Sequence, residues 1–330
     1  MVCVYAVAPM RVLLVKTSSM GDVIHNLPVV ADIRARYPYA RIDWLVEEAF
    51  ADIPRLNPGV ERVIPVALRR WRRQLLRPAV WREMAAFRRR VWAHAYDVIL
   101  DTQGLIKSAL LARLAQGAHV GYCADCAREP LAARFYDRCH SVDAQAHAVV
   151  RYRALAAAAF ALPADLPLDY GLPRPAQAPS FAPEAPYGVL LTATSRREKL
   201  WPEAHWVALG HALVSRGFGL VLPWGSLAEY ERARRIADQL PGTIPAPRLT
   251  LTEAAALLAH ARLVVGVDTG LAHLATAVGT PTIGLYGGSD PRRNGLYATT
   301  PVANLGVPGR FAQVSEVLAV VDTWLGRGTV

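Results

Sequence analysis

The chain has 330 residues, of which 53% are hydrophobic and 19% are charged. This composition excludes a disordered chain, and the length predicts two domains of roughly 150 residues each. No run of about 18 uncharged apolar residues occurs, so the sequence predicts no transmembrane helix. The apolar start resembles a signal peptide, but it continues directly into a strand-like segment. We therefore treat residues 1–9 as a short N-terminal extension and expect a cytoplasmic protein.

The net charge of +10 is concentrated in residues 60–90, which contain ten arginines and two glutamates. Such a patch attracts the phosphates of nucleic acids, anionic lipids or acidic glycans, and its alternative is a solvated helix face. The solvated face is preferred for Arg82 and for arginines 88–90. No nucleic-acid-binding motif accompanies the patch, so nucleic acid is not the expected partner.

The chain has 34 arginines but only three lysines, Lys16, Lys107 and Lys199. A lysine among so many arginines can mark a position that needs a compact ammonium group. If the sequence simply favours arginine over lysine, a few lysines can also remain by chance. Both interpretations stay open for Lys16 and Lys199.

The four cysteines fit a reducing compartment. Cys123, Cys126, Cys139 and His140 would offer ligands to zinc. No second ligand pair completes the set, so we expect small buried or loop cysteines and no metal.

Apolar runs alternate with helical patterns, which is the rhythm of a parallel α/β sheet. The expected strands, in chain order, are residues 11–15, 42–46, 63–66, 98–101, 189–193, 219–223, 263–267 and 282–286. The expected helices are residues 23–37, 80–95, 109–115, 144–160, 202–216, 227–240, 252–260 with Thr252 as the cap, 270–278 and 312–325.

Seven prolines within residues 163–186 predict a linker, because proline at that density suits neither a helix interior nor a central strand. The fold class is therefore α/β, with two Rossmann-like domains, residues 10–162 and 187–330, facing a central cleft. The last helix either packs on the second domain, to which it belongs in sequence, or packs back on the first domain. Ligands of such sheets bind at the carboxyl ends of the strands.

Three loops at such strand ends carry polar groups. In residues 16–22, Lys-Thr-Ser-Ser-Met-Gly-Asp, Asp22 either accepts a proton from a bound hydroxyl or simply caps the following helix. Residues 266–273, Gly-Val-Asp-Thr-Gly-Leu-Ala-His, offer helix N-terminal amides to a diphosphate, although His273 alone is equally well a packing residue. Residues 192–202 place two hydroxyls near Lys199, which suits a diphosphate leaving group; the alternative is an exposed basic loop.

The absence of G-x-G-x-x-G and Walker A sequences argues against a dinucleotide oxidoreductase and a P-loop enzyme. Taken together, the motifs resemble those of the ADP-heptose:lipopolysaccharide heptosyltransferases, two-Rossmann-domain (GT-B) enzymes of glycosyltransferase family 9. The resemblance runs from about Met10 to about Trp324. The segments that carry it are residues 15–22, 44–48, 69–72, 127–130, 199–202, 222–225 and 267–273. The S-S-M-G-D and R-R-W-R sequences resemble the first heptosyltransferase of the core more than the second or third.

The resemblance implies that heptose passes, with inversion, from ADP-L-glycero-β-D-manno-heptose to the Kdo of Kdo-lipid A, without metal or cofactor. It implies that Asp22 is the base and that Lys199 acts catalytically on the leaving group. The implied donor-binding residues are Thr194, Ser195, Lys199, Glu229, Asp268, Thr269, Gly270 and His273. The implied acceptor-binding residues are Ser19, Gly21, Arg69, Arg70, Arg72 and Arg128.

Two positions depart from the family pattern: Ser195 replaces a second threonine, and residues 286–291, Y-G-G-S-D-P, replace Y-G-P-T-D-P. The resemblance also implies a peripheral protein on the cytoplasmic face of the inner membrane of a Gram-negative bacterium. Two alternatives stay open: a nucleotide-sugar epimerase of similar fold and a non-catalytic anion-binding protein.

Overall fold

The computed structural model describes residues 9–163, 165–184, 186–194, 196–326 and 328. The chain forms two compact units, which divide between Gly171 and Leu172. This division falls inside residues 163–186, the segment predicted as a linker. Of the predicted N-terminal extension, only its last residue belongs to the described part.

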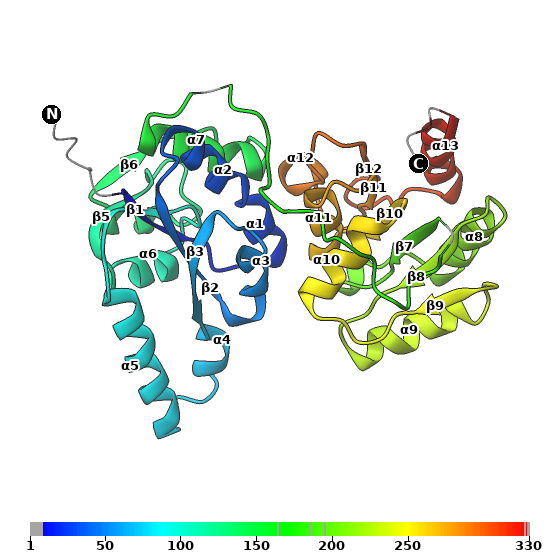
Figure 1. Cartoon of the computed structure of the whole chain (residues 1–330), viewed down its shortest axis with the longest axis horizontal. Helices are drawn as coiled ribbons and strands as arrows, with labels where there is room; N and C mark the ends of the chain where they lie inside the picture. The colour runs from blue at the N-terminus through cyan, green and yellow to red at the C-terminus, as the bar shows by residue number, and fades with distance from the viewer. Residues whose placement is uncertain (1–8, 164, 185, 195, 327, 329–330) are drawn as a thin grey trace, which may run out of the picture. The chain divides into compact units, whose positions relative to one another are not determined.

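The N-terminal unit is built on a parallel sheet of six strands in the order β3-β2-β1-β4-β5-β6 (Figure 1). Its strands are β1 (Arg11–Val15), β2 (Arg41–Glu47), β3 (Val60–Val66), β4 (Ala95–Asp101), β5 (Gln116–Tyr122) and β6 (Arg138–His140). Its helices are α1 (Met20–His25), α2 (Pro28–Arg36), α3 (Asp52–Arg55), α4 (Leu68–Trp71), α5 (Pro78–Trp92), α6 (Ile106–Ala112), α7 (Ala148–Phe160), and the short 3-10 helices Glu48–Phe50 and Pro130–Phe135.

The strand order of this unit reverses between β1 and β4, and such a reversal is where ligands of Rossmann-type sheets bind. In the register of the sheet, Val15 of β1 lies opposite Asp101 of β4. The loops that follow these two strands therefore begin side by side. Buried apolar side chains, among them Leu13, Ile99 and Phe87, pack α5 against the sheet and fix these strand ends.

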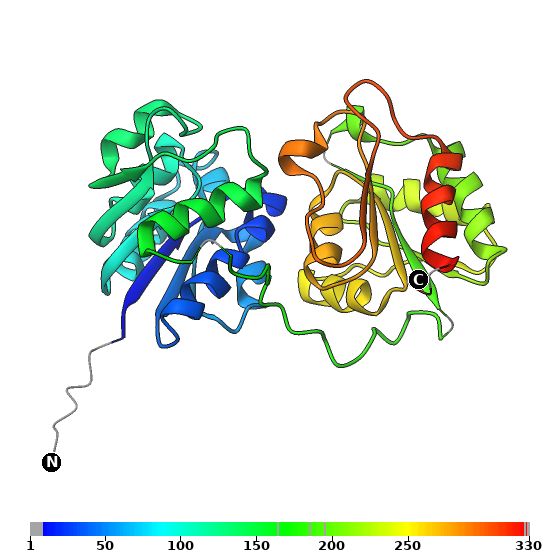
Figure 2. The same ribbon diagram turned by 90° about the horizontal axis from the view of Figure 1, so that it is seen from above.

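The predicted helix over residues 23–37 is wrong in one respect, because the structure divides it. α1 ends at His25, and α2 begins with Pro28 at its first position. Proline lacks the amide hydrogen and is tolerated at the start of a helix but not inside one. α7 runs alongside α2 (Figure 2). The fork of Arg153 joins the two helices by donating to both carboxylate oxygens of Asp32, at 2.8 and 2.9 Å.

The C-terminal unit repeats the plan with the strand order β12-β11-β10-β7-β8-β9. Its strands are β7 (Tyr187–Leu191), β8 (Gly219–Leu222), β9 (Thr243–Pro245), β10 (Leu263–Val267), β11 (Thr282–Leu285) and β12 (Val302–Leu305). Its helices are α8 (Glu203–Val214), α9 (Leu227–Ala237), α10 (Leu251–His260), α11 (Gly270–Ala277), α12 (Pro291–Asn294), α13 (Val314–Gly326) and the 3-10 helix Arg197–Lys199. Both orders are those of Rossmann domains, so the predicted fold class is confirmed.

In this unit the cap of one helix differs from the prediction, and the position of the last helix, which the sequence left open, is decided. The cap of α10 is Thr250, not Thr252: Glu253 Oε2 accepts from the Thr250 backbone N–H at 2.7 Å, and Thr250 Oγ1 accepts from the Glu253 N–H at 3.2 Å. The last helix, α13, packs on α8 (Figure 2) and contributes Val317, Val321 and Trp324 to the core of this unit. None of the described helices is long and apolar enough to cross a membrane.

Candidate functional site

In the N-terminal unit the structure places Asp22 in the first turn of α1, directly after the loop that follows β1. Its Oδ2 accepts hydrogen bonds from the backbone N–H and the hydroxyl of Ser19, both at 3.1 Å. Its Oδ1 accepts from the Tyr152 hydroxyl at 2.6 Å. Ser19 occupies the N-cap position, so Asp22 is not the N-cap residue; it contributes to capping from the N3 position, because its carboxylate accepts from the Ser19 N–H. The Asp22 side chain is 12% exposed and remains within reach of a ligand.

Two cations surround this carboxylate. Arg128 Nη1 lies 3.7 Å from Asp22 Oδ2, so the structure brings these two predicted site residues together. Burial raises the pKa of Asp22, but the charges of Lys16 and Arg128 and the hydrogen bonds from Tyr152 and Ser19 outweigh burial. They hold the pKa of Asp22 well below its usual range. The carboxylate is therefore ionised at neutral pH and free to accept a proton from a bound hydroxyl.

Lys16 lies entirely inside the unit. Its side chain is 0% exposed, its ammonium donates to the Thr102 carbonyl at 3.0 Å, and it lies 3.6 Å from the centre of the Tyr152 ring. Burial lowers its pKa to about 7, although the neighbouring charge of Asp22 raises it. Lys16 thus acts on groups of its own unit and presents no surface to a ligand.

Gln103, which was not singled out from the sequence, holds the loop between β1 and α1 in place. Gln103 is 2% exposed, and its Oε1 accepts from the Thr17 N–H at 2.8 Å and the Ser18 N–H at 3.2 Å. Its Nε2 donates to the Ser18 carbonyl at 2.7 Å. The signal that would have found it is the polar run Thr-Gln-Gly directly after a buried strand, at the edge where β1 also ends.

Gln103 is itself positioned by Asp101, another residue not singled out from the sequence. Asp101 is 0% exposed, and its Oδ1 accepts from the backbone N–H of Gln103 at 2.8 Å and of Gly104 at 3.3 Å. Its Oδ2 accepts from the hydroxyls of Ser108 and Tyr136 at 2.7 and 2.9 Å. Burial is the main cause that raises the pKa of Asp101.

The other acceptor candidates lie at or after α4 and differ in how they are held. The guanidinium of Arg70 bonds Glu48 at 3.0 and 3.1 Å and Glu83 at 2.9 Å. Arg69 lies over the Phe50 ring, 5.5 Å from its centre. Arg72 is exposed and has no ion-pair partner within the described part of the chain.

The structure also places the other arginines and the glycine named for this unit. Arg82 and arginines 88–90 are exposed on α5, in accordance with the predicted solvated face. Gly21 lies in the first turn of α1, half-buried, between Ser19 and Asp22.

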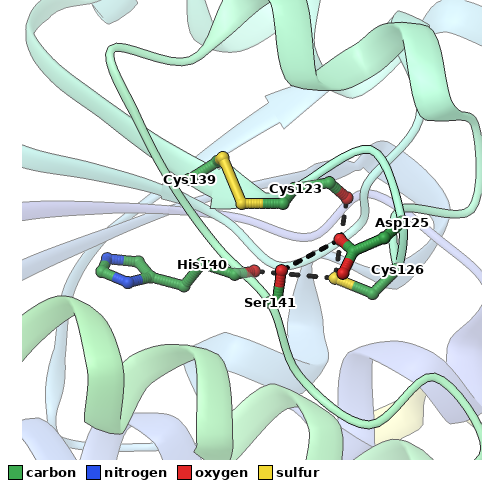
Figure 3. Close-up of a disulfide and its surroundings, with 6 residues drawn as sticks. All are labelled: Cys123, Asp125, Cys126, Cys139, His140 and Ser141. Carbon is green, nitrogen blue, oxygen red and sulfur yellow. Dashed lines mark hydrogen bonds between the residues drawn. A yellow bond between two sulfur atoms is a disulfide. The ribbon is translucent and has the colours of Figure 1, made fainter.

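The loop that carries Arg128 is closed by a disulfide (Figure 3). Cys123, after β5, is bonded to Cys139 of β6, so the expectation of unlinked cysteines is wrong for these two. Cys126 is a free buried thiol, as expected, and donates to the carbonyls of Cys123 and His140. The disulfide removes both thiolates from the zinc alternative. Among the residues described, no group of three or more His, Cys, Asp or Glu side chains could hold a metal ion.

In the C-terminal unit the predicted donor residues gather around Asp268, which follows β10. The ammonium of Lys199 lies 2.6 Å from Asp268 Oδ2. His273 Nε2 lies 3.7 Å from Asp268 Oδ1, and the Thr194 hydroxyl donates to the Asp268 carbonyl at 3.0 Å. The structure thus joins loops from two neighbouring strands, β7 and β10, at the point where the strand order reverses. Ser195, also predicted here, lies outside the described residues.

The charge of this cluster is fixed by its hydrogen bonds. Burial raises the pKa of Asp268, but hydrogen bonds from His273, Lys199 and Ser289 outweigh burial and hold that pKa well below its usual range. Ser289 was missed from the sequence, although it lies in the Y-G-G-S-D-P segment that departs from the family pattern. A Cβ on Gly288 would lie 3.1 Å from Lys199 Cγ, so glycine there allows the Ser289 loop to approach Lys199.

Three further donor candidates lie at the same edge of the sheet. Thr269 is the N-cap of α11 and Gly270 is its first residue, both half-buried. Glu229 follows β8, and its Oε2 accepts from the Gly225 N–H at 2.7 Å in the turn that starts α9. Glu229 therefore shapes this turn whatever it binds.

The chain is similar to a family of known enzymes. The family model "Glycosyltransferase family 9 (heptosyltransferase)" matches residues 84–312. The chain is 48% identical over 302 residues to lipopolysaccharide heptosyltransferase 1 of Pseudomonas aeruginosa, covering 89% of this chain and 83% of that protein.

Two solved structures of E. coli heptosyltransferase WaaC have a similar fold at 41% identity. The structure with ADP has a TM-score of 0.86 and covers 97% of this chain and 100% of that one. The structure with ADP-2-deoxy-2-fluoro heptose has a TM-score of 0.85 and covers 95% and 99%. With a family model over most of its length and relatives this similar, the chain belongs to glycosyltransferase family 9, the heptosyltransferases.

Proposed function

We propose that this chain transfers L-glycero-D-manno-heptose from ADP-heptose to the Kdo of Kdo-lipid A, with inversion, in the assembly of the lipopolysaccharide inner core. Relatives named lipopolysaccharide heptosyltransferase 1, and a similar structure with an ADP-heptose analogue, support this substrate class. The observation that carries the proposal is the ionised Asp22 beside Arg128, a base next to a cation suited to an acidic acceptor.

In the proposed reaction Asp22 is the general base. A hydroxyl oxygen of Kdo attacks C1 of the heptose on the face opposite the ADP, and its proton passes to Asp22 Oδ2. The bond between C1 and the phosphate oxygen breaks, and ADP leaves with the electron pair. Kdo and its lipid anchor carry carboxylate and phosphate groups, for which the exposed fork of Arg128 is a suitable partner.

The leaving ADP gains negative charge, and we assign its stabilisation to the C-terminal unit. Lys199 is 19% exposed, and its ammonium carries three N–H groups. One of them donates to Asp268, which leaves two for the phosphates of ADP. The backbone amides of Thr269 and Gly270 at the start of α11 favour an anion. A preorganised cation beside a leaving group lowers the barrier without reorganisation of water.

Binding of the acceptor is assigned to the N-terminal unit, with Ser19, Gly21, Arg69, Arg70, Arg72 and Arg128. We further propose that the protein works at the cytoplasmic face of the inner membrane as a peripheral protein, because its acceptor is a lipid. The arginines in and directly after α4 would then face anionic headgroups. No metal or cofactor is required for this chemistry.

The test uses purified full-length chain with ADP-heptose and Kdo-lipid A, and follows both ADP release and the heptosylated product. Asp22→Asn should reduce turnover by about 100-fold or more, as expected for loss of a general base, while calorimetry shows unchanged ADP binding. The matched control is Asp52→Asn, an exposed carboxylate paired with Arg55 on α3, which should keep full turnover.

Three outcomes contradict the proposal. Full turnover by Asp22→Asn would refute the base assignment. Absence of ADP binding would refute every nucleotide-sugar reaction. A product formed from ADP-heptose without any acceptor would favour the epimerase alternative.

A further inference from the structure

We propose that Tyr152 is a positioning residue for the base: its hydroxyl fixes one oxygen of Asp22 so that the other oxygen receives the proton. The inference rests on the proposed function, because it takes Asp22 as the base. Neither the sequence motifs nor the resemblance singled out Tyr152.

The geometry gives the two oxygens of Asp22 different surroundings. Oδ1 accepts the hydrogen bond from the Tyr152 hydroxyl at 2.6 Å, and Tyr152 is only 4% exposed. Oδ2 accepts from Ser19, which is exposed, and lies 3.7 Å from the exposed Arg128. The buried phenol therefore covers Oδ1, whereas the neighbours of Oδ2 lie at the surface, and we assign the approach of the acceptor to that side.

The chemistry of the phenol allows it only one role. Burial and the charge of Asp22 raise the pKa of Tyr152 well above its usual value. The hydroxyl therefore stays protonated and acts as a hydrogen-bond donor. Tyr152 therefore does not accept a proton from Asp22. Because a carboxylate rotates about its Cβ–Cγ bond, a fixed donor on Oδ1 restricts that rotation and orients Oδ2.

The face of the Tyr152 ring packs against the buried side chain of Lys16. The ammonium of Lys16 lies 3.6 Å from the ring centre and donates to the Thr102 carbonyl at 3.0 Å, next to the end of β4. A cation over a phenol face is attracted by the ring quadrupole, more strongly where water is excluded. This contact gives the buried lysine a function that its isolation among 34 arginines had only suggested.

The helix that carries Tyr152 is anchored on both sides of this residue. Arg153 pairs with Asp32 of α2, and Arg151 Nη2 donates to the Cys126 carbonyl at 2.9 Å. Cys126 lies in the loop that carries Arg128. α7 therefore holds the base directly and the arginine beside it through the loop.

The test is Tyr152→Phe, which keeps the ring over Lys16 and removes only the hydroxyl. We expect kcat to fall about tenfold or more, because misplaced catalytic groups are costly in rate. The KM values for both substrates and the affinity for ADP should stay within about twofold, because neither substrate loses a direct contact.

The matched control is Tyr122→Phe. Tyr122 is also buried, but its hydroxyl has no hydrogen-bond partner within the described structure. This variant should keep the wild-type kcat. The same Tyr152→Phe change in an Asp22→Asn background should alter the residual turnover less than twofold, because a residue that acts through another loses its effect when that partner is gone.

Three results would overturn the inference. A kcat for Tyr152→Phe within twofold of wild type would mean that the hydroxyl does not position the base. A parallel change of kcat and both KM values together with a lower melting temperature would indicate a merely structural role. A further tenfold loss in the Asp22→Asn background would show that Tyr152 acts independently of Asp22. If instead Asp22→Asn itself were fully active, the proposed function, rather than this inference alone, would fail.

Discussion

Replacement of Gln103 by leucine tests whether the loop before Asp22 is held by one buried side chain. Leucine has a similar volume but offers neither a donor nor an acceptor. Three buried backbone groups would lose their partner: the N–H of Thr17, the N–H of Ser18 and the carbonyl of Ser18. The Thr17 hydroxyl, which also donates to Gln103 at 3.1 Å, would lose a partner as well.

The expected magnitude follows from these lost bonds. Each buried polar group without a partner costs about 1–3 kcal/mol, so three of them lower the stability of this loop by about 3–9 kcal/mol if the loop does not relax. Asp22 follows the loop directly, and displacement of a catalytic group by about 1 Å can cost on the order of 100-fold in rate. We therefore expect kcat of Gln103→Leu to fall about 10- to 100-fold, with ADP affinity unchanged.

The assay is hydrogen exchange by mass spectrometry on peptides that cover residues 11–25, combined with steady-state kinetics. The amides of Thr17 and Ser18 should exchange faster in Gln103→Leu, because their acceptor is gone. The control is Gln116→Leu, since Gln116 makes a single exposed bond, to the Trp92 carbonyl at 3.2 Å. Wild-type exchange and wild-type kcat in Gln103→Leu would refute the reasoning.

Three further outcomes are expected. Arg72→Gln should raise the acceptor KM several-fold. Arg70→Gln should raise the acceptor KM less and should also lower the melting temperature, because two glutamates already hold Arg70; steady-state kinetics and thermal unfolding of both variants separate these effects, and equal KM values would contradict the distinction. Cys139→Ser, or reduction of the wild type, should lower the unfolding free energy of the N-terminal unit by about 3 kcal/mol, because the disulfide closes a loop over a sequence separation of 16. If a reductant destabilised Cys139→Ser further, the loss of stability would not come from this disulfide. The folded-state pKa of Asp268 is depressed, so its contribution to stability is present above about pH 4 and is lost as the pH falls further. The melting temperature of Asp268→Asn should therefore decline less than that of the wild type between about pH 6 and pH 3. Parallel declines of the two melting temperatures would contradict the lowered pKa.

Most of the sheet could be predicted because its strands are buried apolar runs. Residues 11–15 and 263–267 are strands with the predicted bounds, since both lie at the centre of a sheet. Four strands were missed: β5, β6, β9 and β12. β6 and β9 have three residues each, and β6, β9 and β12 lie at or next to an edge, where few apolar residues are required. β5, Gln-Gly-Ala-His-Val-Gly-Tyr, has glycines and polar residues that hide its pattern.

The site could be predicted where its residues belong to polar motifs at strand ends, even when two such motifs are far apart in the sequence. Lys199, Asp268 and His273 were expected in one site, and the structure brings them together. Tyr152 could not be predicted, because it reaches Asp22 across a sequence separation of 130 residues and stands in an alanine-rich helix without a motif. The Cys123–Cys139 bond depends likewise on the pairing of β5 with β6, two strands whose patterns are weak.

The two units use an aspartate at a strand end in opposite ways, and the difference explains the division of labour that we propose. Asp268 binds Lys199 directly at 2.6 Å and so fixes a cation whose remaining donors we assign to the phosphates. Asp22 makes only a longer contact with Arg128, at 3.7 Å, and that arginine is 42% exposed. Because the contact is long and the arginine itself is partly exposed, we expect an acidic acceptor to draw Arg128 toward itself. The loss of that charge would raise the pKa of Asp22 and make it a stronger base only when the acceptor is bound.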